Sequence, residues 1–222
     1  MEIWSEIGAI FSAFASQDSF EIRSALRSDA AWFVGTLACV IGGLLVMVVY
    51  RKIPFLDRHL ERTIMVWSYL AIAFIIFWGV IDRFVFSSQQ PWSTTIPPLL
   101  FMIMAWFGAA FNVRLRTHLS FAEFRTAMPR AAQMACLTLD AILWLGFAVV
   151  VLVTTTRVTA LSASNFQIVL GTDNVMQWWF LMTIPLSFLL LTARVFENFF
   201  EDVSNFRRGE PLIRQAVIGE NV

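Results

Sequence analysis

Long runs of apolar residues dominate the hydrophobic pattern of this sequence. A membrane hydrocarbon core about 30 Å thick is crossed by a helix of about 20 apolar residues. Five runs reach or approach this length: Ala30 to Tyr50, Thr63 to Ile81, Ile96 to Val113, Ala131 to Thr156 and Asn174 to Ala193. Each run is continuously apolar, whereas the strands of a membrane β-barrel alternate. The pattern therefore predicts an all-α membrane protein, a bundle of about five transmembrane helices.

Prolines mark two of these runs. Pro97 and Pro98 lie in the first turn of the third run, where the N–H that proline lacks would have no helical partner. Pro185 lies in the middle of the fifth run, where we expect a kink whose freed backbone groups are satisfied by neighbouring groups. We expect the second run to continue to Phe86 and the fifth to continue towards Phe200.

The segment before the first run has the pattern of an amphipathic helix. Apolar residues recur in it at helical spacing: Ile3, Ile7, Ile10 and Phe14. Asp18 followed by Glu21 predicts a capping box that opens a second short helix. Both helices are expected to lie in the membrane interface.

Two connectors show a related pattern. Ser120 with Glu123 predicts another capping box, and the segment from Lys52 to Arg62 places Phe55 and two leucines among charges. The pattern favours segments that only anchor the bundle among the lipid headgroups. A role in docking a partner protein stays open.

Composition supports the membrane assignment. Hydrophobic residues make up 58% of the chain and charged residues 14%, against about 25% charged in an average soluble domain. This balance excludes an ordinary soluble enzyme, a disordered tail and a secreted disulfide scaffold. Cys39 and Cys136 lie inside apolar runs and are interpreted as small core residues. The formal net charge is zero, so no global basic face suggests nucleic acid.

The basic residues are divided unevenly between the two sides of the predicted bundle. Twelve of the 16 follow the first, third or fifth run: Arg51, Lys52, Arg58, Arg62, Arg114, Arg116, Arg125, Arg130, Arg194, Arg207, Arg208 and Arg214. The other four lie on the opposite side: Arg23, Arg27, Arg83 and Arg157. Lys and Arg concentrate in cytoplasmic loops, so this count predicts an external N-terminus and a cytoplasmic C-terminus.

The sequence offers few residues that could carry chemistry. Its two histidines, His59 and His118, lie in connectors, which argues against a haem held between facing helices. We find no Gly-rich phosphate loop, no Cys cluster and no Ser/His/Asp set at a common depth. We therefore expect no enzymatic activity, no catalytic, substrate or metal site, and no cofactor. Small residues at Gly42-Gly43 and at 108–110 are typical of close helix packing.

Asp140 is the one acid clearly inside a predicted span. A charge at such a depth is costly and marks either a function or an ion pair. Arg194 lies at a similar depth on the fifth span, so we expect Asp140 and Arg194 to form a structural ion pair. An ion- or proton-carrying role for Asp140 stays open as the alternative.

Short aromatic and basic strings follow one another in a particular order from Leu60 onwards. They are Leu60-Glu61-Arg62, Arg83-Phe84-Val85-Phe86, Pro91-Trp92, Trp106 with Phe107-Gly108-Ala109-Ala110, Arg114 to Leu119, and Arg194-Val195-Phe196. This order resembles the small membrane subunit of tripartite ATP-independent periplasmic (TRAP) transporters, the DctQ-like or Q-type subunit. Two departures are that Ser93-Thr94-Thr95 stands where the family usually carries acids, and that residues 1–50 are an addition.

The resemblance implies a heterodimer in a bacterial inner membrane. In such a transporter a large membrane subunit carries the solute and sodium sites and moves like an elevator, and a periplasmic binding protein delivers an organic solute such as a carboxylate. The small subunit, in contact with membrane lipids, enlarges the fixed scaffold. The implied organisation is an interfacial segment (1–29), an extra transmembrane helix (30–50), a four-helix domain (51–208) and a cytoplasmic tail (209–222). The ion-pair or interface candidates are Asp140, Arg194, Arg83, Trp92 and His118.

Two other function classes stay open. A membrane anchor of a redox complex would need residues that contact haem or quinone, and an independent small transporter would carry its solute without a partner. The sequence does not identify the solute, since the resemblance places that choice in the other two subunits.

Overall fold

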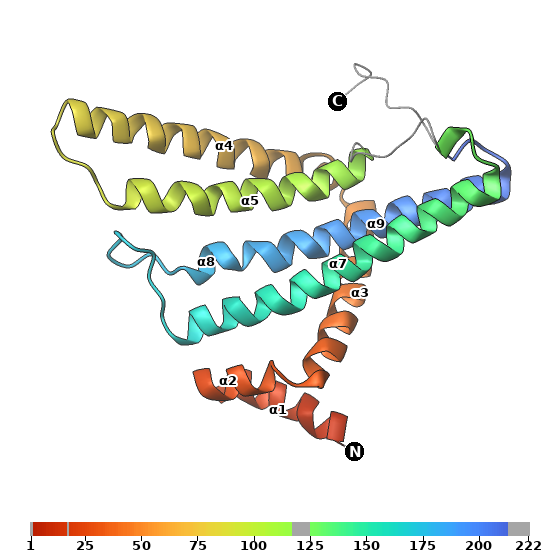
Figure 1. Ribbon diagram of the computed structural model, residues 1–222, viewed down its shortest axis with the longest axis horizontal. Coiled ribbons are helices and arrows are strands. Elements are labelled where there is room, and N and C mark those ends of the chain that lie inside the picture. Colours follow the sequence, from red (N-terminus) through yellow and green to blue (C-terminus); the bar gives the residue numbers. More distant parts are fainter. Residues whose placement is uncertain (1, 17, 117–124, 213–222) are drawn as a thin grey trace.

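The computed structural model describes residues 2–16, 18–116 and 125–212, and helices make up its regular structure (Figure 1). In chain order these are α1 (Glu2–Ser16), α2 (Ser19–Ala25), α3 (Asp29–Lys52), α4 (Pro54–Phe84), α5 (Trp92–Leu115), α7 (Arg130–Ser164), α8 (Trp178–Leu181) and α9 (Thr183–Arg208). An isolated antiparallel bridge joins Ile168 to Met176 in the loop before α8. The prediction of an all-α membrane protein is confirmed.

Five segments of the described chain are long and apolar enough to cross a membrane: α3, α4, α5, α7 and the stretch formed by α8 and α9. The predicted number of spans is therefore confirmed. In Figure 1, α4, α5, α7 and α9 lie with their axes broadly aligned, whereas α3 crosses α7 and α9. Much of the apolar surface of these helices faces outwards, as in a protein whose surroundings are lipid or other membrane subunits.

Helix α4 begins at Pro54, well before the predicted start at Thr63. Proline is favoured in the first turn of a helix because its fixed φ suits the helix and its missing N–H would be unpaired there. The charged segment from Lys52 to Arg62 is therefore mostly the first turns of a long helix, and the prediction of a separate connector was wrong.

The kink expected at Pro185 is not where the sequence places it. The apolar stretch is interrupted at Met182, between α8 and α9, and Pro185 lies in the first turn of α9. A proline inside a helix removes one hydrogen bond and its ring clashes with the preceding turn. Beginning a new helix just before Pro185 avoids both penalties. The predicted start at Asn174 was also too early, since residues 174–177 belong to the loop.

Helix α9 lies at the centre of the bundle, in contact with α3, α5 and α7. Phe188 of α9 is 1% exposed, and its ring lies 5.0 Å from that of Trp106 and 5.6 Å from that of Phe147, centroid to centroid. The buried core around it comes from four helices: Cys39, Ala110, Val113, Ala148, Leu152, Ile184, Leu191 and Val195. Helix α4 packs mainly against α5 and has a smaller contact with α3.

Small residues let α3 approach α9 closely. A Cβ atom on Gly43 would lie 2.5 Å from Cγ2 of Thr192, and one on Gly42 would lie 2.8 Å from Cδ2 of Leu189. Cys39, one turn before Gly43, places its sulfur 3.3 Å from the hydroxyl of Thr192. The prediction that these small residues serve close helix packing is confirmed.

Helices α1 and α2 pack against each other, α1 packs against α3, and α2 also contacts α7. Ile10 of α1 is buried against Ala30 and Ala31 of α3, and the carboxylate of Glu6 accepts a hydrogen bond from the backbone N–H of Ala30. Asp18 caps α2 as predicted, by accepting from the N–H of Phe20 at 2.7 Å. Its expected partner Glu21 instead accepts from Ser16 at 2.6 Å, so the second half of the capping box is not formed.

Candidate functional site

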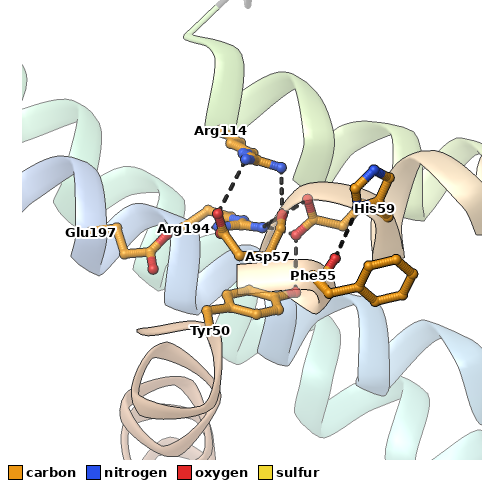
Figure 2. Close-up of polar contacts among 8 residues, drawn as sticks. Tyr50, Phe55, Asp57, His59, Arg114, Arg194 and Glu197 are labelled. Carbon is orange, nitrogen blue, oxygen red and sulfur yellow. Dashed lines mark hydrogen bonds and ion pairs between the residues drawn. The ribbon is translucent and has the colours of Figure 1, made fainter. Parts of the chain in front are cut away.

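A network of buried charged side chains lies where α3, α4, α5 and α9 meet, and Arg194 of α9 is its centre (Figure 2). The side chain of Arg194 is 2% exposed, and that of Glu61, from α4, is 1% exposed. Nε of Arg194 donates to Oε1 of Glu61 at 2.8 Å, and Nη2 donates to Oε2 at 3.1 Å. Such two-pronged pairing of guanidinium and carboxylate is the strong form of a salt bridge.

Asp57, one turn before Glu61 on α4, is held by two arginines. One carboxylate oxygen pairs with Arg194, and the other pairs with Nη2 of Arg114, at the end of α5, at 3.2 Å. The backbone carbonyl of Asp57 accepts from Nη2 of Arg194 at 2.8 Å and also from Arg114. Glu197, one turn further along α9, pairs with Nη1 of Arg194 at 2.9 Å. Asp57 and Arg194 thereby join three helices.

Tyr50, close to the end of α3, attaches a fourth helix to the same network. Its hydroxyl donates to Oε1 of Glu61 at 3.0 Å. The guanidinium carbon of Arg194 lies 4.0 Å from the centre of the Tyr50 ring, close enough for a cation–π interaction. Figure 2 shows the ring lying against the arginine.

The local sequence explains why these side chains meet. Residues four apart in a helix share a face, so Asp57 and Glu61 both point from α4 towards α9. The break at Ile53 between α3 and α4 turns the chain so that Tyr50 and Glu61 approach each other. On α9, Arg194 and Glu197 are three residues apart and also share a face.

The network is a joint between helices. Three carboxylates face two guanidinium groups, and each of these side chains has a partner of opposite charge. Charges removed from water are tolerated only when they are paired and hydrogen-bonded in this complete manner. Because the charges satisfy one another, the arrangement is suited to holding four helices in a fixed relation.

Further polar contacts continue the joint along α9. Nδ2 of Asn198 donates to the carbonyl of Val113 in α5 at 2.8 Å. Arg116, just after α5, pairs with Asp202 at 2.6 Å and with Glu201 at 3.2 Å. The end of α5 is therefore fixed to the part of α9 between Asn198 and Asp202.

The expected ion pair between Asp140 and Arg194 was wrong. Asp140 pairs instead with Arg125, in the segment before α7, and Nη2 of Arg125 donates to Oδ1 at 3.1 Å. Helix α7 has 35 residues, more than the about 20 that cross the hydrocarbon core. Because the helix begins at Arg130, Asp140 lies close enough to its start for Arg125, which precedes the helix, to reach it. The hydrogen bond to Asp140 raises the pKa of Arg125.

Arg83 and Trp92, two of the other candidate residues, lie apart from the network. Arg83 is exposed at the end of α4, where its guanidinium lies 5.8 Å from the centre of the Phe84 ring. Trp92 is half-buried at the start of α5. There Gly171, with a φ of +80°, approaches Pro91 so closely that a Cβ would lie 2.7 Å from its carbonyl carbon. His118, like the Ser120 and Glu123 of the predicted capping box, lies outside the described residues.

Sequence reasoning missed most partners of Arg194. In the sequence Tyr50 ends an apolar run, and Asp57 and Glu61 lie among the charges between the first two runs. Arg114, which binds Asp57 and not Arg194, follows the third run. One signal could have found the acids: Asp57 and Glu61 are spaced four apart and follow Pro54 directly, which is typical of one face of a helix that starts there. Without the fold, however, nothing in the spacing indicates that this face points towards α9.

Within the described residues, no group of three or more His, Cys, Asp or Glu side chains is placed to hold a metal ion. The two cysteines are free thiols, Cys39 buried and Cys136 partly so.

Comparison with known families assigns a large part of the chain. Residues 72–205 match the family described as tripartite ATP-independent periplasmic transporters, DctQ component. The match begins within α4 and ends within α9, and so covers more than half of the chain. It includes Arg194 but leaves out α1 to α3 and the first turns of α4, with Tyr50, Asp57 and Glu61. Comparison with curated proteins gives no match.

Proposed function

Since the chain belongs to the DctQ family, the small membrane subunits of TRAP transporters, we propose that it forms part of the fixed scaffold on which a large membrane subunit moves its solute. The two subunits form a heterodimer in a bacterial inner membrane. The N-terminus of this chain is periplasmic and its C-terminus is cytoplasmic.

The Arg194 network is the observation that supports a scaffold role. An immobile subunit must keep its helices in one arrangement while its partner moves. Four helices meet at Arg194, which is 2% exposed and fully paired. Removing one member of such a buried pair typically costs about 3–5 kcal/mol, so the joint resists rearrangement.

The transport cycle is the finer part of the proposal. The description of the family names a periplasmic transporter with three parts, which supports a periplasmic binding protein as the third component. We propose that this binding protein delivers an organic solute such as a carboxylate, and that sodium drives its uptake by symport through the large subunit.

Reconstitution tests this function. Vesicles that contain this chain, a co-expressed large TRAP membrane subunit and their binding protein should take up a labelled solute, chosen by screening organic acids against the binding protein, when sodium is higher outside. Omitting this chain should abolish uptake. Vesicles with this chain alone should take up none of the same acid.

Three results would contradict the proposal. Undiminished uptake without this chain would show that it is not part of the transporter. Uptake by this chain alone would assign it an independent transport activity. Failure of the large subunit to copurify with the tagged chain would exclude the heterodimer.

A further inference from the structure

The corner between α3 and α4, defined as residues 51–62, separates its charges completely. Its two acids, Asp57 and Glu61, point into the protein, where they form ion pairs in the Arg194 network. Its four basic side chains are exposed: Arg51, Lys52, Arg58 and Arg62. Among the described residues none of these four is in an ion pair. The outer surface of the corner is therefore cationic.

Three neighbouring rows of side chains along α4 create this separation. Residues four apart share a face of a helix, so Asp57 and Glu61 form the inner row, and Arg58 with Arg62 forms the next. The third row begins with Phe55, which is 70% exposed and stacks on the ring of His59, four residues later, at a centroid distance of 4.8 Å. Basic and aromatic surfaces thus lie side by side.

The length of α4 places this corner at the edge of the membrane. The helix has 31 residues, or about 46 Å at 1.5 Å per residue, which exceeds a hydrocarbon core of about 30 Å. Its uncharged stretch, from Thr63 to Ile81, is long enough to fill that core. The turns that carry Arg58 and Arg62 therefore lie at the level of the lipid headgroups.

We propose that the α3–α4 corner binds the headgroups of anionic phospholipids in the leaflet that it faces. Arg51, Lys52, Arg58 and Arg62 pair with lipid phosphates, and the exposed ring of Phe55 enters the boundary of the acyl chains. Arginine and lysine beside an anionic membrane surface each contribute about five-fold in binding. The charge, the adjoining aromatic surface and the depth all match lipid, and the binding does not depend on the transporter role.

Lipid binding by the purified full chain tests this inference. In a neutral detergent, native mass spectrometry should count more bound dioleoyl phosphatidylglycerol than dioleoyl phosphatidylcholine. The double variant Arg58→Gln with Arg62→Gln should lower this preference by about ten-fold or more, at roughly five-fold per side chain. The matched control, Arg23→Gln with Arg27→Gln, removes the same charge from exposed positions on and just after α2 and should keep the preference. Thermal unfolding should be the same for both variants.

Other outcomes would overturn the inference. Equal binding of the two lipids by the native chain, or an unchanged preference in the Arg58 and Arg62 variant, would show that the corner is not a lipid site. Full competition by millimolar inorganic phosphate would assign the surface to a free anion. A variant that keeps the lipid preference but no longer copurifies with the large subunit would assign the surface to protein docking.

Discussion

The side chain of Arg194 is 2% exposed, and its guanidinium group pairs with carboxylates from α4 and from its own helix. The desolvation penalty of these charges is offset only while all of them are present. Losing the cation would leave Asp57, Glu61 and Glu197 close together, with Arg114 as the remaining guanidinium of the network. The stability of the joint therefore depends on one residue more than on any other member.

Arg194→Met should lower the free energy of unfolding by about 3–5 kcal/mol, because it strands buried carboxylates. Thermal unfolding of the purified chain in detergent measures the loss. Arg208→Met, at the exposed end of the same helix, should change stability by about 0.5 kcal/mol at most. Similar losses for the two variants would show that the network is not a stabilising joint.

Asp140 should be energetically coupled to Arg125 and independent of Arg194. The side chains of the observed pair are 28% and 21% exposed, so a coupling of about 1 kcal/mol is expected for a partly solvated pair. A double-mutant cycle with Asp140→Asn and Arg125→Gln measures it by thermal unfolding. The cycle of Asp140→Asn with Arg194→Gln should be additive, and a larger coupling there would contradict the observed pairing.

At the scale of elements, the seam between α3 and α9 depends on the absence of side chains. Gly43 faces Thr192, which is 0% exposed and cannot turn aside freely, since its hydroxyl donates to the carbonyl of Phe188 at 2.8 Å. A side chain at position 43 would therefore push two packed helices apart. Close packing holds helix α3 along this seam, and the hydrogen bond from Tyr50 to Glu61 holds its end.

Gly43→Ala should destabilise the protein by about 1–3 kcal/mol, as overpacking of a close seam does. Gly146→Ala in α7 is the matched control, because a Cβ there meets nothing within 4 Å. That substitution should be neutral, or stabilising by up to about 1 kcal/mol through helix propensity. Thermal unfolding of both variants decides, and a neutral Gly43→Ala would show that α3 can move away from α9 at little cost.

At the scale of the whole molecule, the family match covers residues 72–205, yet the Arg194 network reaches beyond it. Tyr50 and Glu61 lie before the matched segment, and both contact Arg194 within it. The N-terminal helix α3 is thus integrated into the bundle and is not a loose addition. Since α1 and α2 precede α3, the orientation of α3 in the membrane decides on which side α1 and α2 lie.

The distribution of basic residues predicts that the two ends of the chain lie on opposite sides of the membrane. Reporter fusions after residue 25 and after residue 222 should give opposite signals, periplasmic for the first and cytoplasmic for the second. The basic residues between the first and second spans (Arg51, Lys52, Arg58 and Arg62) and between the third and fourth spans (Arg114, Arg116, Arg125 and Arg130) should be protected from reagents that act from outside the cell. Signals from the same side would mean that α3 does not cross the membrane.

The sequence by itself determined the class of fold and the number of spans. An apolar run of about 20 residues has few stable states other than a helix in lipid, because every backbone group in lipid must be hydrogen-bonded. Glycines at 42 and 43 also indicated close packing, since a missing side chain is visible in sequence. Helix ends were less well determined, as Pro54 and Pro185 show. An apolar run indicates which residues lie in the hydrocarbon core, whereas the helix can begin or end outside that run.

Only the tertiary structure decided which charges meet. The similar membrane depth of Asp140 and Arg194 suggested that they pair. Depth gives the position of a side chain along the membrane normal, however, and not the direction in which it faces. The break at Ile53 and the crossing of α3 over α9 bring Tyr50, Asp57 and Glu61 to Arg194, while Asp140 is taken by Arg125. Ion pairs between distant segments act over a few ångströms, so they depend on how helices are rotated and packed, which no local pattern encodes.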